Sequence, residues 1–283
     1  MIVIGITIIL TMLSLQKHHI MDLYCTVRDL IPEEPKEKGG RPPLMTKQEV
    51  LTILTWNVCT LHQKTLKDIH SSLCMYHSDD FTHIPKYNAF IKTCHDCIPL
   101  LEKILSILLV QSAPLRIVDS TMIPVCKLVR ADRHKVAKSI ATYGKNHQGW
   151  HYGFKLHASV DMEGRLAQVY FTGANFYDAQ ALPFILNKHT CIAVGDGTYQ
   201  ASVMRARIWR DYRCHVVAPV HFKQTKKLIT YWQHKLLTFR PKIETVFDYL
   251  KEHLHFVTSF PRSINGYLLH YLKTLVGYCF LTC

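Results

Sequence analysis

Apolar and polar residues alternate with either a two-residue or a helical period along the second part of the chain. β-Branched or alternating apolar residues bounded by turn signals predict five strands, at 115–123, 153–160, 166–171, 191–194 and 214–220. Apolar residues that recur every three or four positions predict helices at 179–186, from 201 onward, at 240–254 and at 263–278. This alternation favours an α/β fold, in which we expect the last helix to pack beside the 240–254 helix.

The first part of the chain carries only helical patterns. Thr46-Lys-Gln-Glu49 is a capping-box sequence, and the apolar run that follows it predicts a helix through Trp56. Further helices are predicted at 66–75, 87–94 and 100–110. We therefore expect three segments, an apolar leader at 1–20, a small all-helical domain at 21–111 and an α/β domain at 112–283.

Asp119 lies in the middle of the first predicted strand of the α/β domain. An unpaired carboxylate buried there would cost several kcal/mol, so it must be paired, metal-bound or placed at the open end of the strand. The alternative is an acid that caps a turn at Ser120 and Thr121.

Asp196 ends the apolar run that begins at Cys191, and Gly197 follows it. A strand, an acid at its carboxyl end and a glycine turn form a ligand-site arrangement in open α/β sheets. The alternative is that Asp196 only forms the turn.

Glu244 lies on the amphipathic helix predicted at 240–254. At about 100° per residue, Arg240, Glu244 and Lys251 fall within roughly 40° of one another, beside the apolar stripe. An acid with two cations near it therefore lies where the helix meets the sheet. The alternative is a solvated ion pair between residues four apart.

The order of elements is the ribonuclease-H-like plan, and with a set of short motifs the sequence resembles the DDE transposases of bacterial insertion sequences. The motifs are Asp119 within Ile-Val-Asp-Ser, Tyr143-Gly144, Trp150-His-Tyr-Gly-Phe-Lys-Leu-His157, Thr172-Gly-Ala-Asn175 with Asp178, Asp196 before Tyr199, and Arg240-x3-Glu244-x6-Lys251. The resemblance covers residues 41 to 281. Two positions depart from the family pattern, because Gly-Thr follows Asp196 where Lys-Gly is usual, and Leu237 replaces a tyrosine.

The resemblance implies a ribonuclease-H-like mixed five-stranded sheet flanked by helices, with a catalytic triad of Asp119, Asp196 and Glu244. These acids would hold two Mg²⁺ ions, for which Mn²⁺ substitutes, with Asp119 shared between them. Water would attack first, and the freed 3′-hydroxyl would then attack target DNA. A catalytically inactive DNA-binding remnant of a transposase is the alternative.

The same resemblance implies the partners and the place of action. The helical domain would bind the terminal inverted repeats of the element, although a plain helical cap on the catalytic domain is an equal alternative. The protein would act as a homodimer or larger assembly on double-stranded DNA, in the bacterial cytoplasm at the nucleoid.

Charge agrees with a DNA partner, since 34 Lys and Arg against 21 Asp and Glu give a net charge of +13. The candidate DNA-binding residues are Arg240, Lys251, Lys127, Arg130, Arg133, Lys135, Lys138, Lys145 and Arg41. A solvated basic loop is the alternative for the cluster between 127 and 145. Three aromatic residues after that cluster, Tyr143, Trp150 and Tyr152, would either stack on unpaired bases or belong to the core.

Residues 1–15 are apolar but fewer than the roughly 20 that a membrane-spanning helix needs. We expect the true translation start at Met12 or Met21, with an interfacial helix or a membrane-associated basic protein as alternatives. The 10 cysteines lack a disulfide framework, which predicts reduced thiols. Cys94-His-Asp-Cys97 lacks a second ligand pair, so a zinc site is not expected.

Overall fold

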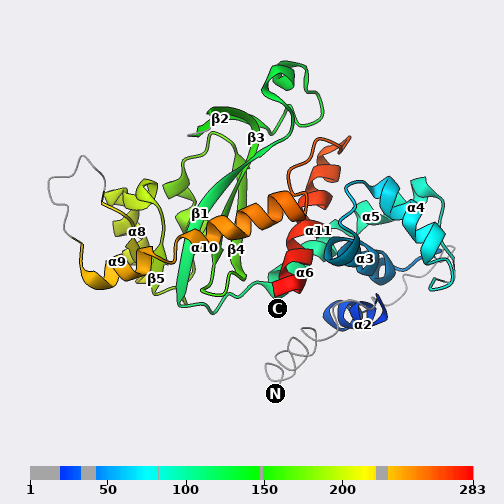
Figure 1. The fold of residues 1–283 in the computed structure, drawn as a ribbon, viewed down its shortest axis with the longest axis horizontal. Coiled ribbons are helices and arrows are strands. Elements are labelled where there is room, and N and C mark those ends of the chain that lie inside the picture. The colour runs from blue at the N-terminus through cyan, green and yellow to red at the C-terminus, as the bar shows by residue number, and fades with distance from the viewer. Residues whose placement is uncertain (1–19, 33–42, 82, 147–148, 221–228, 283) are drawn as a thin grey trace. The chain divides into compact units, whose positions relative to one another are not determined.

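The computed structural model describes residues 20–32, 43–81, 83–146, 149–220 and 229–282, which form two compact units (Figure 1). The helical unit takes its described residues from Met1–Leu108, His253–Phe256 and Phe260–Cys283, and the α/β unit from Leu109–Glu252 and Val257–Ser259. Arg41 and the apolar leader up to residue 19 lie outside the described residues. None of the described helices is long and apolar enough to cross a membrane.

The helical unit contains all the helices predicted for the first part of the chain, and one more. Its elements are α2 (Ile20–Leu30), α3 (Lys47–Trp56), η1 (Asn57–Leu61), α4 (Leu66–Tyr76), α5 (Tyr87–Asp96), α6 (Ile98–Leu108) and α11 (Ile264–Thr282). The capping box is confirmed, because the Thr46 amide donates to Glu49 Oε2 at 2.6 Å and the Glu49 amide donates to Thr46 Oγ1 at 3.2 Å. The helix α2 was not predicted.

The last helix of the chain lies at the centre of the helical unit. α11 packs on α6, η1, α3 and α5, and every residue from Leu269 to Phe280 is buried. A helix that is apolar all round is stable only when other elements surround it. Within its own unit α11 packs on these helices, and the expectation that it lies beside the helix of Glu244 stays a prediction.

The α/β unit is built on a mixed sheet. Its strands are β1 (Leu115–Pro124), β2 (Thr142–Asn146), β3 (Gly149–Val160), β4 (Leu166–Gly173), β5 (Ile192–Val194) and β6 (His215–Val217). The strand order is β2-β3-β1-β5-β6, and β4 also pairs with β3. β1, β5 and β6 are parallel to one another, whereas β3 is antiparallel to β1, β2 and β4.

This sheet confirms the predicted ribonuclease-H-like class, with one strand more than expected. Without β2, the first three strands form an antiparallel meander and two parallel strands extend it beyond β1. The additional strand β2 pairs with Gly149–Gly153, the part of β3 that precedes its pairing with β4. Only Gly144 of β2 is buried, so this strand lacks the apolar alternation from which strands are predicted.

Helical elements surround the sheet and set the positions of the polar residues. They are η2 (Leu128–Arg133), η3 (Asp178–Ala181), α7 (Leu182–Ile185), η4 (Gly197–Gln200), α8 (Ser202–Tyr212), α9 (Tyr231–Leu237), α10 (Pro241–Asp248) and η5 (Tyr249–His253). Leu182, Ile185 and Ile208 pack on Val118 and Ala193 of the sheet. α10 packs on β1 and buries Ile243, Val246 and Phe247, as the apolar stripe predicts (Figure 1).

Candidate active site

Asp119 on β1 and Asp196, two residues beyond the end of β5, lie at the same level of two neighbouring parallel strands. In the pairing of β1 with β5, Ile117 is opposite Val194. Asp119 comes two residues after Ile117, and Asp196 comes two residues after Val194. Since paired strands lie about 4.8 Å apart, this register brings the two acids to one edge of the sheet.

Burial dominates the electrostatics of Asp119. It raises the pKa of the Asp119 carboxyl to about 7, against the lowering effect of the Ser120 amide, which donates to Oδ1 at 2.8 Å. The negative charge of Asp196 raises this pKa further, and the positive charge of Arg240 lowers it. Burial therefore disfavours the charged form of Asp119, and the charged neighbours shift its pKa in both directions.

Asp196 forms the turn that follows β5. Its Oδ1 accepts the Thr198 amide at 2.9 Å and the Thr198 hydroxyl at 2.5 Å, which caps η4. The turn-forming alternative is thus present, and it fixes the carboxylate at the edge of the sheet. Tyr199 is fully buried in this turn, where burial and the nearby acids hold its pKa well above the usual range. Its hydroxyl has no hydrogen-bond partner among the described residues.

Glu244 forms an ion pair on the surface of α10. Arg240 Nη2 donates to Glu244 Oε1 at 3.0 Å, and the Glu244 side chain is 50% exposed. This is the i,i+4 ion pair that the sequence offered as an alternative. Exposed pairs of this kind contribute about 0.3–0.5 kcal/mol on a helix, so the contact does little to hold Glu244 away from another ligand.

All three acids nevertheless line one hollow of the α/β unit. This hollow has a volume of about 770 Å³, and its wall includes Asp119, Asp196, Glu244, Arg240 and Lys251. Burial lowers the pKa of Lys251. Within the described residues, no three His, Cys, Asp or Glu side chains are grouped closely enough to hold a metal ion. Asp119 on β1 and Asp196 just after β5 lie on neighbouring segments, while Glu244 pairs with Arg240.

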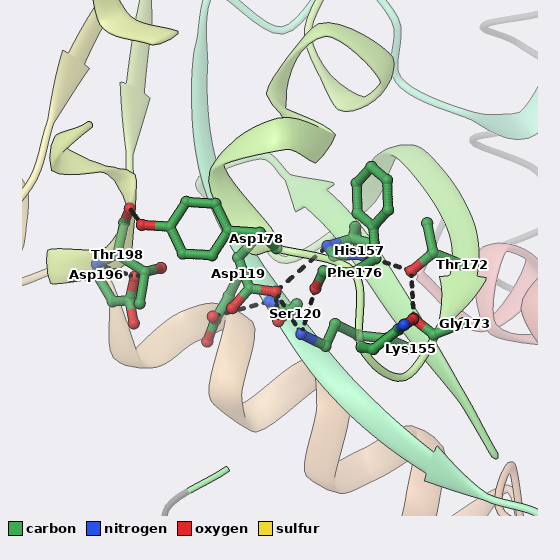
Figure 2. A network of polar contacts seen from close by, with 12 residues as sticks. Asp119, Ser120, Lys155, His157, Thr172, Gly173, Phe176, Asp178, Asp196 and Thr198 are labelled. Carbon is green, nitrogen blue, oxygen red and sulfur yellow. Dashed lines mark hydrogen bonds and ion pairs between the residues drawn. The ribbon is translucent and has the colours of Figure 1, made fainter. Parts of the chain in front are cut away.

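A fourth acid, Asp178, lies beside this site and is held by a network that sequence reasoning did not foresee (Figure 2). Asp178 Oδ1 accepts the Ser120 hydroxyl at 2.8 Å and the Lys155 ammonium at 2.9 Å. Lys155 also donates to the Phe176 carbonyl at 2.8 Å, and its side chain is only 9% exposed. The network therefore ties η3 to β3 and to the residue that follows Asp119.

His157 closes the inner side of the network (Figure 2). His157 Nε2 lies 2.9 Å from Thr172 Oγ1, and Thr172 Oγ1 lies 3.1 Å from the Gly173 carbonyl oxygen. The other ring nitrogen, Nδ1, lies 3.7 Å from Asp178 Oδ1. Burial lowers the pKa of His157 to about 4, so the imidazole is neutral at physiological pH.

The sequence contains one sign of this network, Lys155, although it does not identify the acid that pairs with this lysine. Lys155 occupies a polar position of the alternating strand Gly153-Phe-Lys-Leu-His-Ala-Ser-Val160, and because the fold buries both faces of this strand, the lysine needs an acidic partner. The partner, Asp178, is 23 residues away in sequence, so only the fold brings it close.

Among the other candidate DNA-binding residues that the structure describes, one lines the hollow, and the rest lie on the segment that joins β1 to β2. Lys145 lines the hollow with Arg240 and Lys251, whereas Lys127 lines a smaller neighbouring pocket of about 410 Å³. Arg130, Arg133, Lys135 and Lys138 are exposed on and after η2.

The aromatic residues after this segment are partly exposed and partly packed. Trp150 is 56% exposed, and the Lys145 ammonium lies 5.8 Å from its ring centre. Tyr152 is buried and lies 4.9 Å from the ring of Tyr143, which is 42% exposed. Trp150 and Tyr143 thus present aromatic surface, and Tyr152 belongs to the core.

The fold and this site together define a ribonuclease-H-like protein with one acid in the middle of β1 and a second just beyond the carboxyl end of the neighbouring parallel strand β5. Residues 110–264 match the family described as Transposase DDE domain, which is more than half of the chain, so the chain belongs to that family of transposases. The matched range contains Asp119, Asp196 and Glu244. No curated protein is similar enough to the chain to count as a match.

Proposed function

We propose that this transposase cuts DNA at the ends of its own mobile element and joins those ends to target DNA, using divalent cations. The observation that carries the proposal is the level placement of Asp119 and Asp196 on parallel strands, in a hollow that Glu244 also lines. The family match supports a transposase, and the resemblance to insertion-sequence enzymes supports the finer assignment.

The donor set fits Mg²⁺ or Mn²⁺ in kind. Both ions prefer carboxylate oxygens, and Mg²⁺ needs only a few protein ligands because it keeps several waters. Burial raises the pKa of the Asp119 carboxyl to about 7, and a bound cation would stabilise its charged form there. We infer that Asp119, Asp196 and Glu244 would together hold the cations, with Glu244 released from Arg240. Bound cations would activate the attacking oxygen and stabilise the leaving one.

In this arrangement, other residues of the chain would fix the position of Asp119 and bind the DNA. Asp119 must be ionised to act as a ligand, and its place beside Ser120 is fixed by the Asp178 and Lys155 network. Arg240 and Lys251 lie on the same wall and would neutralise the phosphate that is cut. No covalent intermediate with the protein is needed, because an oxygen nucleophile from water or from the DNA end attacks directly.

The DNA partners follow from the same assignment. The exposed cations Lys127, Arg130, Arg133, Lys135 and Lys138, with Lys145 at the hollow, would contact the backbone of the duplex. Arg41 is proposed for the same role by its sequence context alone. We further propose that the helical N-terminal region binds the terminal repeats and that a homodimer or larger assembly pairs two ends.

The Arg240–Glu244 ion pair favours a second candidate, a DNA-binding remnant without catalytic activity. In that case Glu244 would be a surface residue of α10 and not a ligand. The two candidates share the fold and the positive charge, and they differ only in cleavage.

The test is cleavage of a linear duplex that carries the genomic DNA from both sides of the gene, with Mg²⁺ or Mn²⁺. We expect the purified protein to cut at the element ends. Asp119→Asn, Asp196→Asn and Glu244→Gln should each reduce the rate at least about a hundredfold and leave DNA binding intact, since each removes a charged ligand.

Glu163→Gln is the matched control, because Glu163 is an exposed acid of the β3–β4 turn with 65% of its side chain accessible. It should cut like the unaltered protein. Unaltered protein that binds the duplex and never cuts would favour the remnant, and full activity in any one acid variant would remove that acid from the site.

A further inference from the structure

The helix α8 carries a concentration of arginine that the assignments above do not use. Ile208 is its only buried residue, and Arg205, Arg207 and Arg210 are exposed along it, with Arg213 as its C-cap. Its only acid is Asp211. A helix with so little apolar surface gains little from packing, so its composition calls for another explanation.

The packed side of α8 is defined by three side chains. Ile208 joins the core beneath the helix, and Met204 and Tyr212 pack against the same core. The Tyr212 hydroxyl donates to the Pro183 carbonyl at 3.1 Å, which fixes the end of the helix. The remaining surface of α8 therefore faces solvent in the α/β unit.

Arg205, Trp209 and Arg213 follow one another at four-residue spacing and form what we call the arginine stripe of α8. Residues four apart on a helix are neighbours, so Arg205 and Trp209 fall within about 40° of each other, and Arg213 is the C-cap that ends the helix after them. The Arg213 guanidinium lies 5.7 Å from the Trp209 ring centre, and His215 flanks the same ring at 4.8 Å. Trp209 is 44% exposed, so the stripe presents a flat aromatic surface between two cations.

The charge of the stripe is not balanced by neighbouring acids. Asp211 forms its contacts with Arg207 at 3.5 Å and with Arg210 at 3.3 Å. Within the described part of the chain, neither Arg205 nor Arg213 forms an ion pair with an acid. The stripe is therefore suited to an anionic partner from outside the chain.

The position of α8 connects the stripe to the acids. Asp196 caps η4, and α8 begins two residues after η4 ends, so its first turn lies at the carboxyl end of β5. Arg205 lies in that turn, and Arg213 lies roughly 12 Å further along the helix axis. One DNA strand presents three or four phosphates over that length.

We propose that the arginine stripe of α8 binds the backbone of the DNA duplex whose cleaved phosphate lies at Asp119 and Asp196. This inference rests on the proposed function, because it adds a surface to the same DNA path. Guanidinium groups suit phosphate, since their planar donors pair with two of its oxygens. Contacts of this kind carry no base information, so the stripe holds any sequence alike.

The test is binding of a 30-base-pair duplex of arbitrary sequence, measured without divalent cation over a series of salt concentrations. Arg205→Glu should weaken binding at least about threefold at low salt and reduce the salt slope by about one, since one phosphate contact is lost. Arg205→Lys, which keeps the charge, should retain the slope. The matched control is Lys188→Glu, which makes the same charge change at an exposed residue before the amino end of β5.

Equal losses in Arg205→Glu and Lys188→Glu would overturn the proposal, because the effect would then be one of net charge. Binding of Arg205→Glu to anionic phosphatidylserine vesicles is measured in parallel, and a loss there without a loss on the duplex would also overturn it. The binding assay does not depend on cleavage, so it separates the two proposals. If the unaltered protein never cuts DNA but only Arg205→Glu weakens binding, the proposed reaction is contradicted and the role of the stripe is supported.

Discussion

The position of Asp119 destabilises the fold when its carboxyl is charged, and the same position suits a ligand of a cation. Its carboxyl is largely buried, has one amide donor from Ser120 and lies near a second acid, so its pKa rises to about 7. The pKa of an aspartate in an unfolded chain is about 3.9. The folded protein therefore holds the Asp119 proton more tightly, and the stability that this proton provides is lost as the pH rises from about 4 through 7.

We expect Asp119→Asn to be more stable than the unaltered protein at pH 8 by on the order of 2 kcal/mol without divalent cation. The difference should shrink toward pH 4, where Asp119 is protonated, and Mg²⁺ or Mn²⁺ should reduce it at pH 8 by binding the charged site. Chemical denaturation at both pH values measures it. Glu163→Gln is the control, and an Asp119→Asn variant that is less stable at pH 8 would contradict this account.

The pairing of Lys155 with Asp178 makes a second prediction at single residues. Lys155→Met leaves Asp178 without its ammonium partner in a poorly solvated place, and we expect a loss of about 2–3 kcal/mol in the free energy of unfolding. The double variant Lys155→Met/Asp178→Asn should lose less than the sum of the single changes. Denaturant unfolding of all four proteins gives the coupling, and additive losses would show that the pair is not energetically linked.

The elements of the α/β unit depend on close approaches between strands. Gly153 of β3 lies opposite Pro124 of β1, and a Cβ atom at Gly153 would lie 2.2 Å from the Ile123 carbonyl oxygen. No side chain fits at that distance from a backbone atom. The β1–β3 pairing, which holds Asp119 in register, therefore requires glycine at this position.

Gly153→Ala should accordingly lower the free energy of unfolding by about 3 kcal/mol or prevent folding, because a backbone strand must move. Gly197→Ala is the matched control, since no atom lies within 4 Å of a Cβ placed there. Thermal unfolding should separate the two variants clearly. Similar melting temperatures for both would show that the strands relax easily.

Several elements with a clear local pattern were predicted from the sequence, although the amphipathic helix α2 was missed, and two elements without such a pattern were not predicted. The apolar stripe of α10 and the capping box of α3 are local patterns, so both helices were found. β2 is polar and short, and α9 has no buried residue, so neither carries a periodic signal. The packing of α11 in the helical unit could not be deduced, because an apolar helix specifies burial but not its partner.

At the scale of the whole molecule, the sequence predicted where the acids lie in the fold but not which side-chain contacts they make. The level placement of Asp119 and Asp196 follows from strand order and register, which the motif order implied. The Asp178 network and the Arg240–Glu244 ion pair depend on contacts between side chains, one of them between distant segments. The family match spans residues 110–264, so a role for the N-terminal helices in binding DNA ends remains a prediction.

Replacement of the acids by cysteine tests most directly whether they are the ligands of catalytic cations. Mg²⁺ prefers oxygen ligands, whereas Mn²⁺ and Zn²⁺ accept a thiolate more readily. The rate of DNA end cleavage is measured for Asp119→Cys, Asp196→Cys and Glu244→Cys with each ion, beside the corresponding alanine variants. We predict that the cysteine variants are inactive with Mg²⁺ and regain cleavage with Mn²⁺ or Zn²⁺, while the alanine variants stay inactive with all three. Undiminished cleavage by a cysteine variant with Mg²⁺, or no recovery with any ion, would contradict the assignment of that acid.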